Sequence, residues 1–204
     1  MRHIPEKNIT EELLLTFEAA CSANPGTLYD RSAWLYVPPF YSDYRYVLGT
    51  AGIKPVICVG LNPSTAAPEA LDNTLKSVQR VADFNGYDSF LMMNLYAQRA
   101  TRPKDMDREA CAFLHRENLC AFEFLLQKTK VVWAAWGAVM ETRGYLLECM
   151  KDFVKIGQRQ GAVWVNAGKK SIKGHPHHPL YLRSDSVFEA FDVEGYLVRS
   201  FPFP

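Results

Sequence analysis

The stretch that most constrains the fold is Val56–Ser64, where four apolar residues run directly into Gly-Leu-Asn-Pro-Ser. An apolar run that ends at glycine, asparagine and proline is typical of a strand buried on both faces that ends in a tight loop. Open α/β sheets bind their ligands beyond the carboxyl ends of such strands. We therefore expect this loop to form part of a functional site.

Two later segments share this design. Phe90–Asn94 is an apolar run that ends in asparagine, and Val131–Gly137 is an apolar run that ends in Trp-Gly. Because the carboxyl ends of parallel strands meet at one edge of a sheet, we expect Asn62 and Asn94 to lie at a shared rim.

Candidate helices alternate with these strands. The pattern predicts one α/β domain over residues 1–204, a three-layer sandwich with a central, mostly parallel, four-stranded sheet. Its parts are an N-terminal helix and aromatic segment (1–50), a motif-bearing core (55–183) and a C-terminal strand or tail (186–204). We expect four helices: one capped by Thr10 and ended by Asn24-Pro25-Gly26, one from Asp72 or Asn73 to Gly86, and two over residues 109–127 and 138–150. We expect strands over residues 44–48, 56–60, 89–95, 130–136 and 162–166.

Composition narrows the class of protein. Forty-eight per cent hydrophobic residues in 204 suit one globular domain, and the formal charge of +1 neither favours nor excludes a polyanionic partner. The five cysteines form no Cys-x-x-Cys pair, so we expect reduced thiols and no structural zinc. No targeting leader and no run of about 18 apolar residues stands out, which predicts a cytoplasmic protein with no membrane partner. No Gly-x-Gly-x-x-Gly or Walker loop occurs, and we expect no cofactor.

Four elements, taken in order, resemble the uracil-DNA glycosylase superfamily. Gly60-Leu61-Asn62-Pro63 resembles its first motif in the form of the mismatch-specific branch, which has asparagine where uracil-specific enzymes have aspartate. Asn94 resembles the strand-end asparagine that reads the pyrimidine edge, and Trp133–Gly137 resembles the strand that ends in Trp-Gly. His178–Leu182, reading His-Pro-Leu-Tyr-Leu, resembles the motif that supplies a catalytic histidine and a loop that enters the minor groove.

The resemblance covers residues 56–182. Within it the chain is similar to an uncharacterised bacterial and phage domain family with Asn-Pro-Ser-Thr-Ala and His-Pro-Leu-Tyr-Leu signatures. The resemblance to the uracil-DNA glycosylase superfamily implies a monofunctional DNA glycosylase, which flips a pyrimidine out of the helix and hydrolyses its N-glycosidic bond. The motifs contain no lysine, which disfavours a lyase that forms a Schiff base.

The resemblance also implies roles for single residues. Glycosidic cleavage creates positive charge on the sugar and negative charge on O2 of the base, so His178 is expected to donate to O2 as a neutral imidazole. Asn62 is expected to hold the attacking water, and Asp72, or less favourably Glu69, to supply a carboxylate; the alternative for Asp72 is a helix cap. The residues expected to bind the substrate are Gly60, Leu61, Pro63, Ser64, Thr65, Asn94, Tyr96 and Arg99.

The loop after Pro63 indicates which kind of base the expected enzyme would bind and excise. Uracil-specific enzymes place a tyrosine here that blocks the pyrimidine 5-position, whereas this chain has the small residues Ser64, Thr65, Ala66 and Ala67. We therefore expect a pocket for damaged or 5-substituted pyrimidines, such as the hydroxymethylated or glucosylated bases of phage DNA, and a role in antiviral defence.

A basic segment suggests where DNA would lie. Residues 153–184 include no aspartate or glutamate, and this one-sign stretch has two interpretations, a phosphate-binding face or a solvated loop. His175, His177 and His178 have no neighbouring acid or cysteine, so we expect no metal there. The residues expected to contact single- or double-stranded DNA are Lys169, Lys170, Lys173, His175, Leu180, Tyr181 and Arg183.

Two other functions remain open from the sequence. The first is a hydrolase or transferase that acts on free modified nucleosides or nucleotides and needs no basic wedge loop. The second is a non-catalytic reader of modified nucleic acid. Neither alternative, nor the glycosylase, requires an obligate protein partner.

Overall fold

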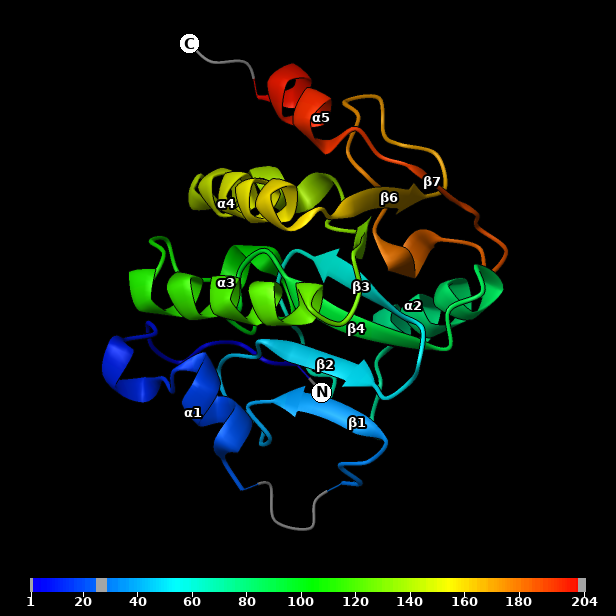
Figure 1. Ribbon diagram of the computed structural model, residues 1–204. Coiled ribbons are helices and arrows are strands. Elements are labelled where there is room, and N and C mark those ends of the chain that lie inside the picture. The colour runs from blue at the N-terminus through cyan, green and yellow to red at the C-terminus, as the bar shows by residue number, and fades with distance from the viewer. Residues whose placement is uncertain (1, 25–28, 202–204) are drawn as a thin grey trace.

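A computed structural model describes residues 2–24 and 29–201 of the chain. A mixed sheet of seven strands runs through the described part in the order β1-β2-β4-β3-β5-β6-β7 (Figure 1). The strands are β1 (Trp34–Val37), β2 (Val47–Thr50), β3 (Pro55–Gly60), β4 (Ser89–Asn94), β5 (Val131–Ala134), β6 (Val163–Ala167) and β7 (Phe188–Ala190).

The expected α/β class is confirmed, but the expected strand count is wrong. The four central strands β4, β3, β5 and β6 are parallel, and β1, β2 and β7 extend the sheet in antiparallel pairs to seven strands. The three added strands have only three or four residues each. Such short runs carry little periodicity. The sequence predicts a strand at residues 44–48, which overlaps β2, and a C-terminal strand or tail that contains β7, but it predicts no strand at β1.

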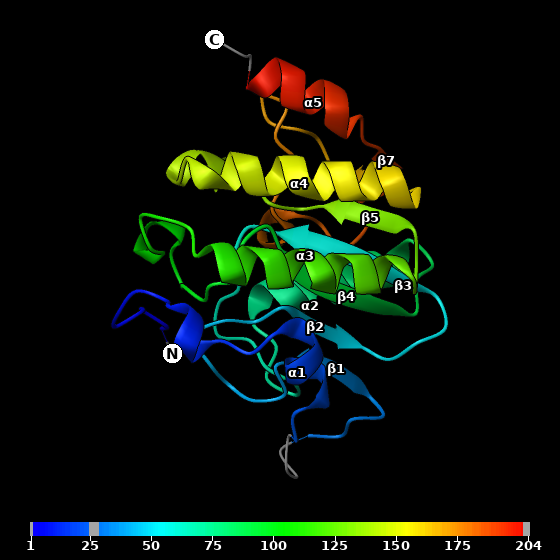
Figure 2. The same cartoon turned by 60° about the vertical axis from the view of Figure 1, so that its left-hand side comes forward.

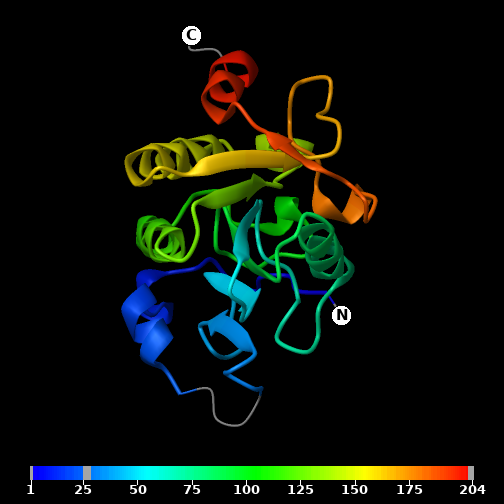
Figure 3. The same cartoon turned by 45° about the vertical axis from the view of Figure 1, so that its right-hand side comes forward.

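Helices cover both faces of the sheet (Figures 2 and 3). On one face lie α1 (Phe17–Ser22), α3 (Ala112–Leu126) and α4 (Tyr145–Gln160), and on the other lies α2 (Asn73–Phe84). Helix α5 (Val193–Ser200) contacts α4 near the C-terminus. Short 3-10 helices occupy Glu11–Leu13 (η1), Pro103–Asp105 (η2), Ala138–Thr142 (η3) and Pro179–Tyr181 (η4), of which η4 packs on α2.

The first helix begins later than the sequence predicts. Thr10 makes no capping hydrogen bond, and the helix starts at Phe17 with Thr16 as its N-cap. The tyrosines of the aromatic segment account for the shift: Leu15 donates from its N–H to Tyr44 Oη, and its carbonyl oxygen accepts from Tyr46 Oη, which holds the chain extended. The helix ends at Ser22; Pro25 and Gly26, which were expected to end it, lie outside the described residues.

The helix expected at residues 138–150 is also displaced. Residues 138–142 form η3, the backbone is extended at Arg143, and α4 then runs from Tyr145 to Gln160. Arg143 interrupts the helix because its guanidinium donates to the carbonyl oxygens of Lys104, Met106 and Asp107. The helix ends at Gly161, which has a positive φ of 72°.

Strand β3 is buried on both faces, as its sequence predicts. Ile57 and Val59 belong to the apolar cluster beneath α3 and α4, and Val56 and Cys58 belong to the cluster beneath α2. All four side chains are fully buried, which fixes the loop after β3 on a rigid base. No helix among residues 2–24 and 29–201 is long and apolar enough to cross a membrane.

Candidate functional site

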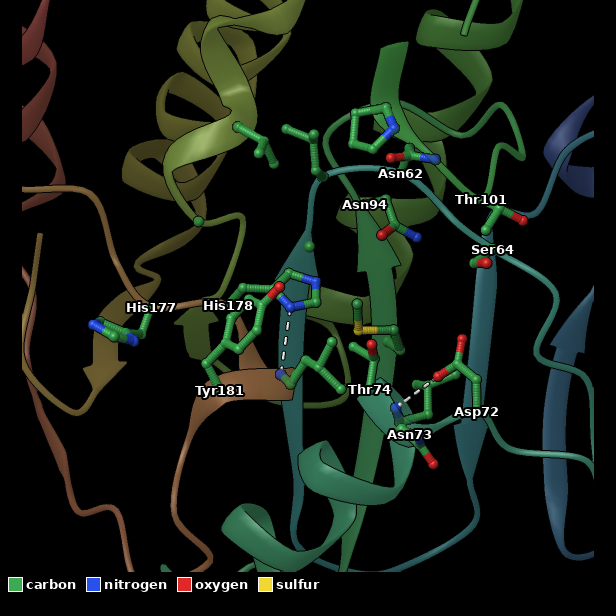
Figure 4. Close-up of a pocket in the computed structure, with 18 of the residues that line it drawn as sticks. Asn62, Ser64, Asp72, Asn73, Thr74, Asn94, Thr101, His177, His178 and Tyr181 are labelled. Atoms are coloured by element: carbon green, nitrogen blue, oxygen red, sulfur yellow. Dashed lines mark hydrogen bonds between the residues drawn. The ribbon is translucent and has the colours of Figure 1, made fainter. Parts of the chain in front are cut away.

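A cavity of about 680 Å³ opens at the carboxyl edge of the parallel strands. Its wall comes from the loop after β3, the end of β4, the amino terminus of α2, the Trp-Gly turn after β5 and the segment that contains η4 (Figure 4). The expected rim is confirmed, since Gly60 pairs with Asn94 across β3 and β4 and Asn62 lines the same cavity.

Most of the expected site residues meet in this cavity. Those that line it are Gly60, Leu61, Asn62, Ser64, Thr65, Asp72, Asn94, His175, His178, Leu180 and Tyr181. Those that do not line it are Pro63, Glu69, Tyr96, Arg99, Lys169, Lys170, Lys173 and Arg183.

Asn94 presents an unpartnered amide to the cavity. Its side chain is 1% exposed, yet neither Nδ2 nor Oδ1 has a hydrogen-bond partner in the described structure. A buried polar atom left without a partner costs about 1–3 kcal/mol, so this amide is held at a cost to stability. The strand end around it is well supported, because Asn118 Nδ2 donates to the carbonyl oxygens of Asn94 at 2.8 Å and Leu95 at 3.3 Å.

Two hydrogen bonds hold the side chain of Asn62, and both are made by its Nδ2 atom and not by Oδ1. Its Nδ2 atom donates to the carbonyl oxygens of Ala100 at 2.7 Å and Pro63 at 3.1 Å. Only the NH₂ group can donate to two carbonyls, so these contacts set the orientation of the amide. Its Oδ1 is therefore the atom that can accept a hydrogen bond from a ligand or a water.

His178 has a defined tautomer. Its Nδ1 atom accepts a hydrogen bond from the Leu180 N–H at 3.3 Å, so the neutral ring carries its proton on Nε2. Burial lowers the pKa of His178 below its ordinary value, and the Asp72 carboxylate opposes this shift. A neutral imidazole with an Nε2–H donor is therefore favoured at neutral pH.

The Trp-Gly turn allows the histidine loop to pack closely. A Cβ atom at Gly137 would stand 3.1 Å from Cβ of His178, and Gly137 has a positive φ of 71°. Any larger residue would meet both a steric and a backbone cost here. The glycine at position 137 thus allows the loop that carries His178 to pack directly against the end of β5 on the cavity wall.

Asp72 caps α2 and also lines the cavity. Its Oδ1 atom accepts from the Leu75 N–H at 2.9 Å, so of the two expected cap residues it is Asp72 that caps the helix. Its charge reaches across the cavity, since it raises the pKa of His178 and Arg45 against the effect of burial. Asp72 can therefore cap α2 and supply a carboxylate to the cavity at the same time.

Tyr96 and Arg99 lie outside the cavity, for different reasons. Tyr96 is fully buried, and its hydroxyl accepts from the Cys111 N–H at 2.8 Å. Arg99 is also fully buried and donates to the carbonyl oxygens of Ser64 and Ala66 and to Tyr36 Oη. Tyr96 therefore supports the core, and Arg99 supports the loop after β3 from behind.

The expected DNA-contacting residues divide into three groups. Lys169 and Lys170 are exposed, as are Leu180 and Tyr181 at the cavity mouth. Lys173 and Arg183 are exposed but paired, with Glu141 at 2.9 Å and Asp185 at 2.9 Å. His175 is 2% exposed and its Nδ1 lies 2.7 Å from Tyr196 Oη, so it faces the interior and not a DNA surface.

Several lining residues were missed from the sequence. The most notable is Arg45, which is 2% exposed and reaches the cavity from the segment before β2. Nothing in its aromatic surroundings marks it as a site residue. The others of note are Thr74, Thr101 and Val139, which belong to no recognised motif.

The described residues contain no group of three or more His, Cys, Asp or Glu side chains that could hold a metal ion. The fold and the cavity together define an α/β protein with a candidate site at the carboxyl edge of its parallel strands. The chain belongs to the family described as "Protein of unknown function (DUF1643)", whose profile matches residues 45–180. Comparison with curated proteins and with solved structures finds no match.

Proposed function

We propose that this protein is a monofunctional DNA glycosylase of the uracil-DNA glycosylase-like kind. It hydrolyses the N-glycosidic bond of a damaged or modified pyrimidine that is flipped into the cavity. The observation that carries the proposal is the buried amide of Asn94, whose donor and acceptor both lack a partner. A pyrimidine edge offers a complementary donor and acceptor side by side, and this pairing offsets the cost of burying the amide.

The proposed chemistry needs three groups around the base. His178 donates from Nε2 to O2 of the departing base, where negative charge develops, and one such donor is worth about 3–4 kcal/mol. Asn62 accepts from the attacking water through Oδ1, and Asp72 supplies the negative charge that favours the positively charged sugar. The neutral tautomer of His178 and the fixed amide of Asn62 support these roles.

The proposed substrate carries a group at the pyrimidine 5-position. A cavity of about 150 Å³ already holds a single six-membered aromatic ring, whereas this cavity is about 680 Å³. Ser64 and Thr65 line it where uracil-specific enzymes are expected to have a blocking tyrosine. A hydroxymethyl or glucosyl group would occupy the space beyond the ring, where Ser64 and Thr65 can donate hydrogen bonds to it. Antiviral defence against modified phage DNA is the corresponding role.

The experiment is base release followed by alkaline strand cleavage. The panel consists of duplexes and single strands that carry uracil, a thymine mismatch, hydroxymethylcytosine or its glucosylated form. We expect release of a 5-modified base by the wild type, and a loss of about 10²–10³-fold in the His178→Ala variant. No release from any substrate, by wild-type protein that binds the modified DNA tightly, would contradict the proposal and favour a reader.

One observation favours the second candidate, an enzyme that acts on free modified nucleosides or nucleotides. Two of the four expected cationic DNA contacts, Lys173 and Arg183, are already paired with carboxylates, which reduces the charge available to a DNA backbone. The salt dependence of DNA binding separates the two cases. Neutralising Lys169 and Lys170 to Gln should lower the slope of log K against log salt by about 2 if both contact phosphates, whereas Lys128→Gln should leave it unchanged.

A further inference from the structure

Arg45, on the cavity wall, and Arg99, behind that wall, are buried beside each other. Arg45 donates from Nη1 to the Ala66 carbonyl oxygen at 3.0 Å, and Arg99 donates from Nη1 to the same oxygen at 3.2 Å. Because both Nη1 atoms donate to one oxygen atom, the two guanidinium groups are close neighbours. Arg45 is 2% exposed and Arg99 is fully buried.

These two charges have little compensation. Among the described residues, no carboxylate lies within ion-pair distance of either guanidinium group, and Nε of each is buried without a partner. In the described part of the chain, Asp72 is the single acidic residue on the cavity wall. Asp72 acts electrostatically on both Arg45 and Arg99, so two buried guanidinium groups have one carboxylate near them.

Arg45 carries a buried charge that, among the described residues, is not paired with any carboxylate. Burial, with repulsion from Arg99, lowers the pKa of Arg45 to about 9. A buried, unpaired charge is costly, and an anion that binds beside it would offset this cost. Guanidinium groups suit phosphate in particular, because their planar N–H donors match its oxygens.

The surroundings of Arg45 also fit an oxyanion. The hydroxyl residues Ser64, Thr65 and Thr74 line the same cavity, and α2 begins there with Asp72 as its N-cap. Figure 4 shows Ser64 and Asp72 on the side of the cavity away from His178. The cavity thus has a base-reading end at Asn94 and His178 and a second polar end at Ser64 and Asp72.

We propose that the Arg45 end of the cavity is a binding site for a phosphate group of the substrate, with Arg45 as the ligand and Arg99 as the residue that positions the Ser64–Ala66 loop. The phosphate can come from the DNA backbone beside the flipped nucleotide or from a free nucleotide. The site does not depend on glycosylase activity, so it can be tested separately from the proposed function.

The first test uses inorganic phosphate as the probe. We expect calorimetric titration to show saturable phosphate binding, and we expect phosphate to raise the thermal unfolding temperature relative to chloride at equal ionic strength. Arg45→Gln should weaken phosphate binding at least tenfold, and Arg45→Lys, which keeps the charge, should retain part of it. The matched control is Arg159→Gln, on the exposed end of α4 at the opposite edge of the sheet, which should bind phosphate as the wild type does. Absence of saturable phosphate binding, or equal binding in folded Arg45→Gln, would overturn the proposal.

The second test identifies the source of the phosphate. If it is the DNA backbone, a neutral methylphosphonate on the 5′ side of the target nucleotide should weaken binding to the wild type but not to Arg45→Gln. If it is a free nucleotide, a deoxynucleoside 5′-monophosphate should bind at least tenfold more tightly than its nucleoside, and Arg45→Gln should remove that difference. If neither pair of ligands shows a difference that depends on Arg45, the site does not hold a substrate phosphate and the proposal is wrong.

Discussion

Gly60 and Asn94 face each other across β3 and β4, and a Cβ atom at Gly60 would stand 2.8 Å from Oδ1 of Asn94. It would also stand 2.5 Å from Cε of Met92. Both contacts are shorter than real Cβ atoms make, so a side chain at Gly60 would force the amide to shift. The glycine of the Gly-Leu-Asn-Pro motif therefore keeps the Asn94 amide at its place on the cavity wall.

The substitution Gly60→Ala tests this relationship. We expect base release to fall by at least tenfold, because the amide is displaced, while the free energy of unfolding falls by about 1–3 kcal/mol from overpacking. Gly144→Ala is the control, since a Cβ atom there meets nothing within 4 Å. Unchanged release kinetics in folded Gly60→Ala would show that the position of Asn94 does not matter for the reaction.

Asn94→Ala should separate function from stability. The variant removes two buried, unpartnered polar atoms, so we expect the free energy of unfolding of the apo protein to stay the same or rise, while base release is lost. Asn118→Ala is the counterpart, because it leaves the carbonyl oxygens of Asn94 and Leu95 unsatisfied and should cost about 1–3 kcal/mol. Denaturant unfolding measures both; a large loss of stability in Asn94→Ala would mean that its amide is structural.

Asp72 can be divided into its two roles by two substitutions. Asn is as good an N-cap as Asp, so Asp72→Ala should be about 1 kcal/mol less stable than Asp72→Asn. Both variants also lose the carboxylate that offsets the buried charges of Arg45 and Arg99. If the carboxylate assists the reaction, both variants should release base more slowly. Full activity of Asp72→Asn would leave Asp72 as a helix cap only.

The lowered pKa of His178 predicts a dependence of stability on pH. Because its folded-state pKa lies below the model-peptide value of 6.5, the folded protein binds fewer protons at this ring than the unfolded chain does. This contribution to stability is present above about pH 6.5 and is lost as the pH falls toward the folded-state pKa. Unfolding measured between about pH 7.5 and 5 should show a shallower dependence in His178→Ala; His3, whose pKa burial also lowers, contributes equally to both proteins.

The rate of base release should depend on the protonation of the His178 imidazole. A proton on Nδ1 of His178 would break the hydrogen bond from the Leu180 N–H that fixes the ring, so we expect the rate of base release to fall as the ring becomes protonated. A rate that rises as the pH falls below about 6.5 would instead indicate that the protonated imidazolium is the active form.

The central strands and the cavity edge were predictable because apolar runs that end in Gly, Asn or Trp-Gly are strong local signals. The same local logic placed Asp72 at the start of α2 and brought Asn62 and Asn94 to one cavity, whereas His178 was expected there only from the resemblance to a known family. The local logic failed where long-range contacts decide the backbone. Tyr44 and Tyr46 hold Leu15 extended and delay α1, and the guanidinium of Arg143 separates η3 from α4.

The errors among the site residues have a similar origin. Tyr96 and Arg99 follow Asn94 closely in sequence, yet the chain carries both into the interior. Arg45 was missed because only the pairing of β2 with β4 brings that segment beside the cavity. His175 carries no mark in the sequence that distinguishes a buried partner of Tyr196 from an exposed DNA contact.

The most direct test of the account is mass spectrometry of the products formed from DNA that carries one 5-modified pyrimidine. A monofunctional glycosylase should release the intact modified base and leave an unbroken strand with an abasic site. The wild type should give both products in equal amounts, and the His178→Ala and Asn94→Ala variants should give neither above background. Release of a free sugar, a nucleotide or a cleaved strand in place of the base, or equal release by folded Asn94→Ala, would contradict the proposed function of this cavity.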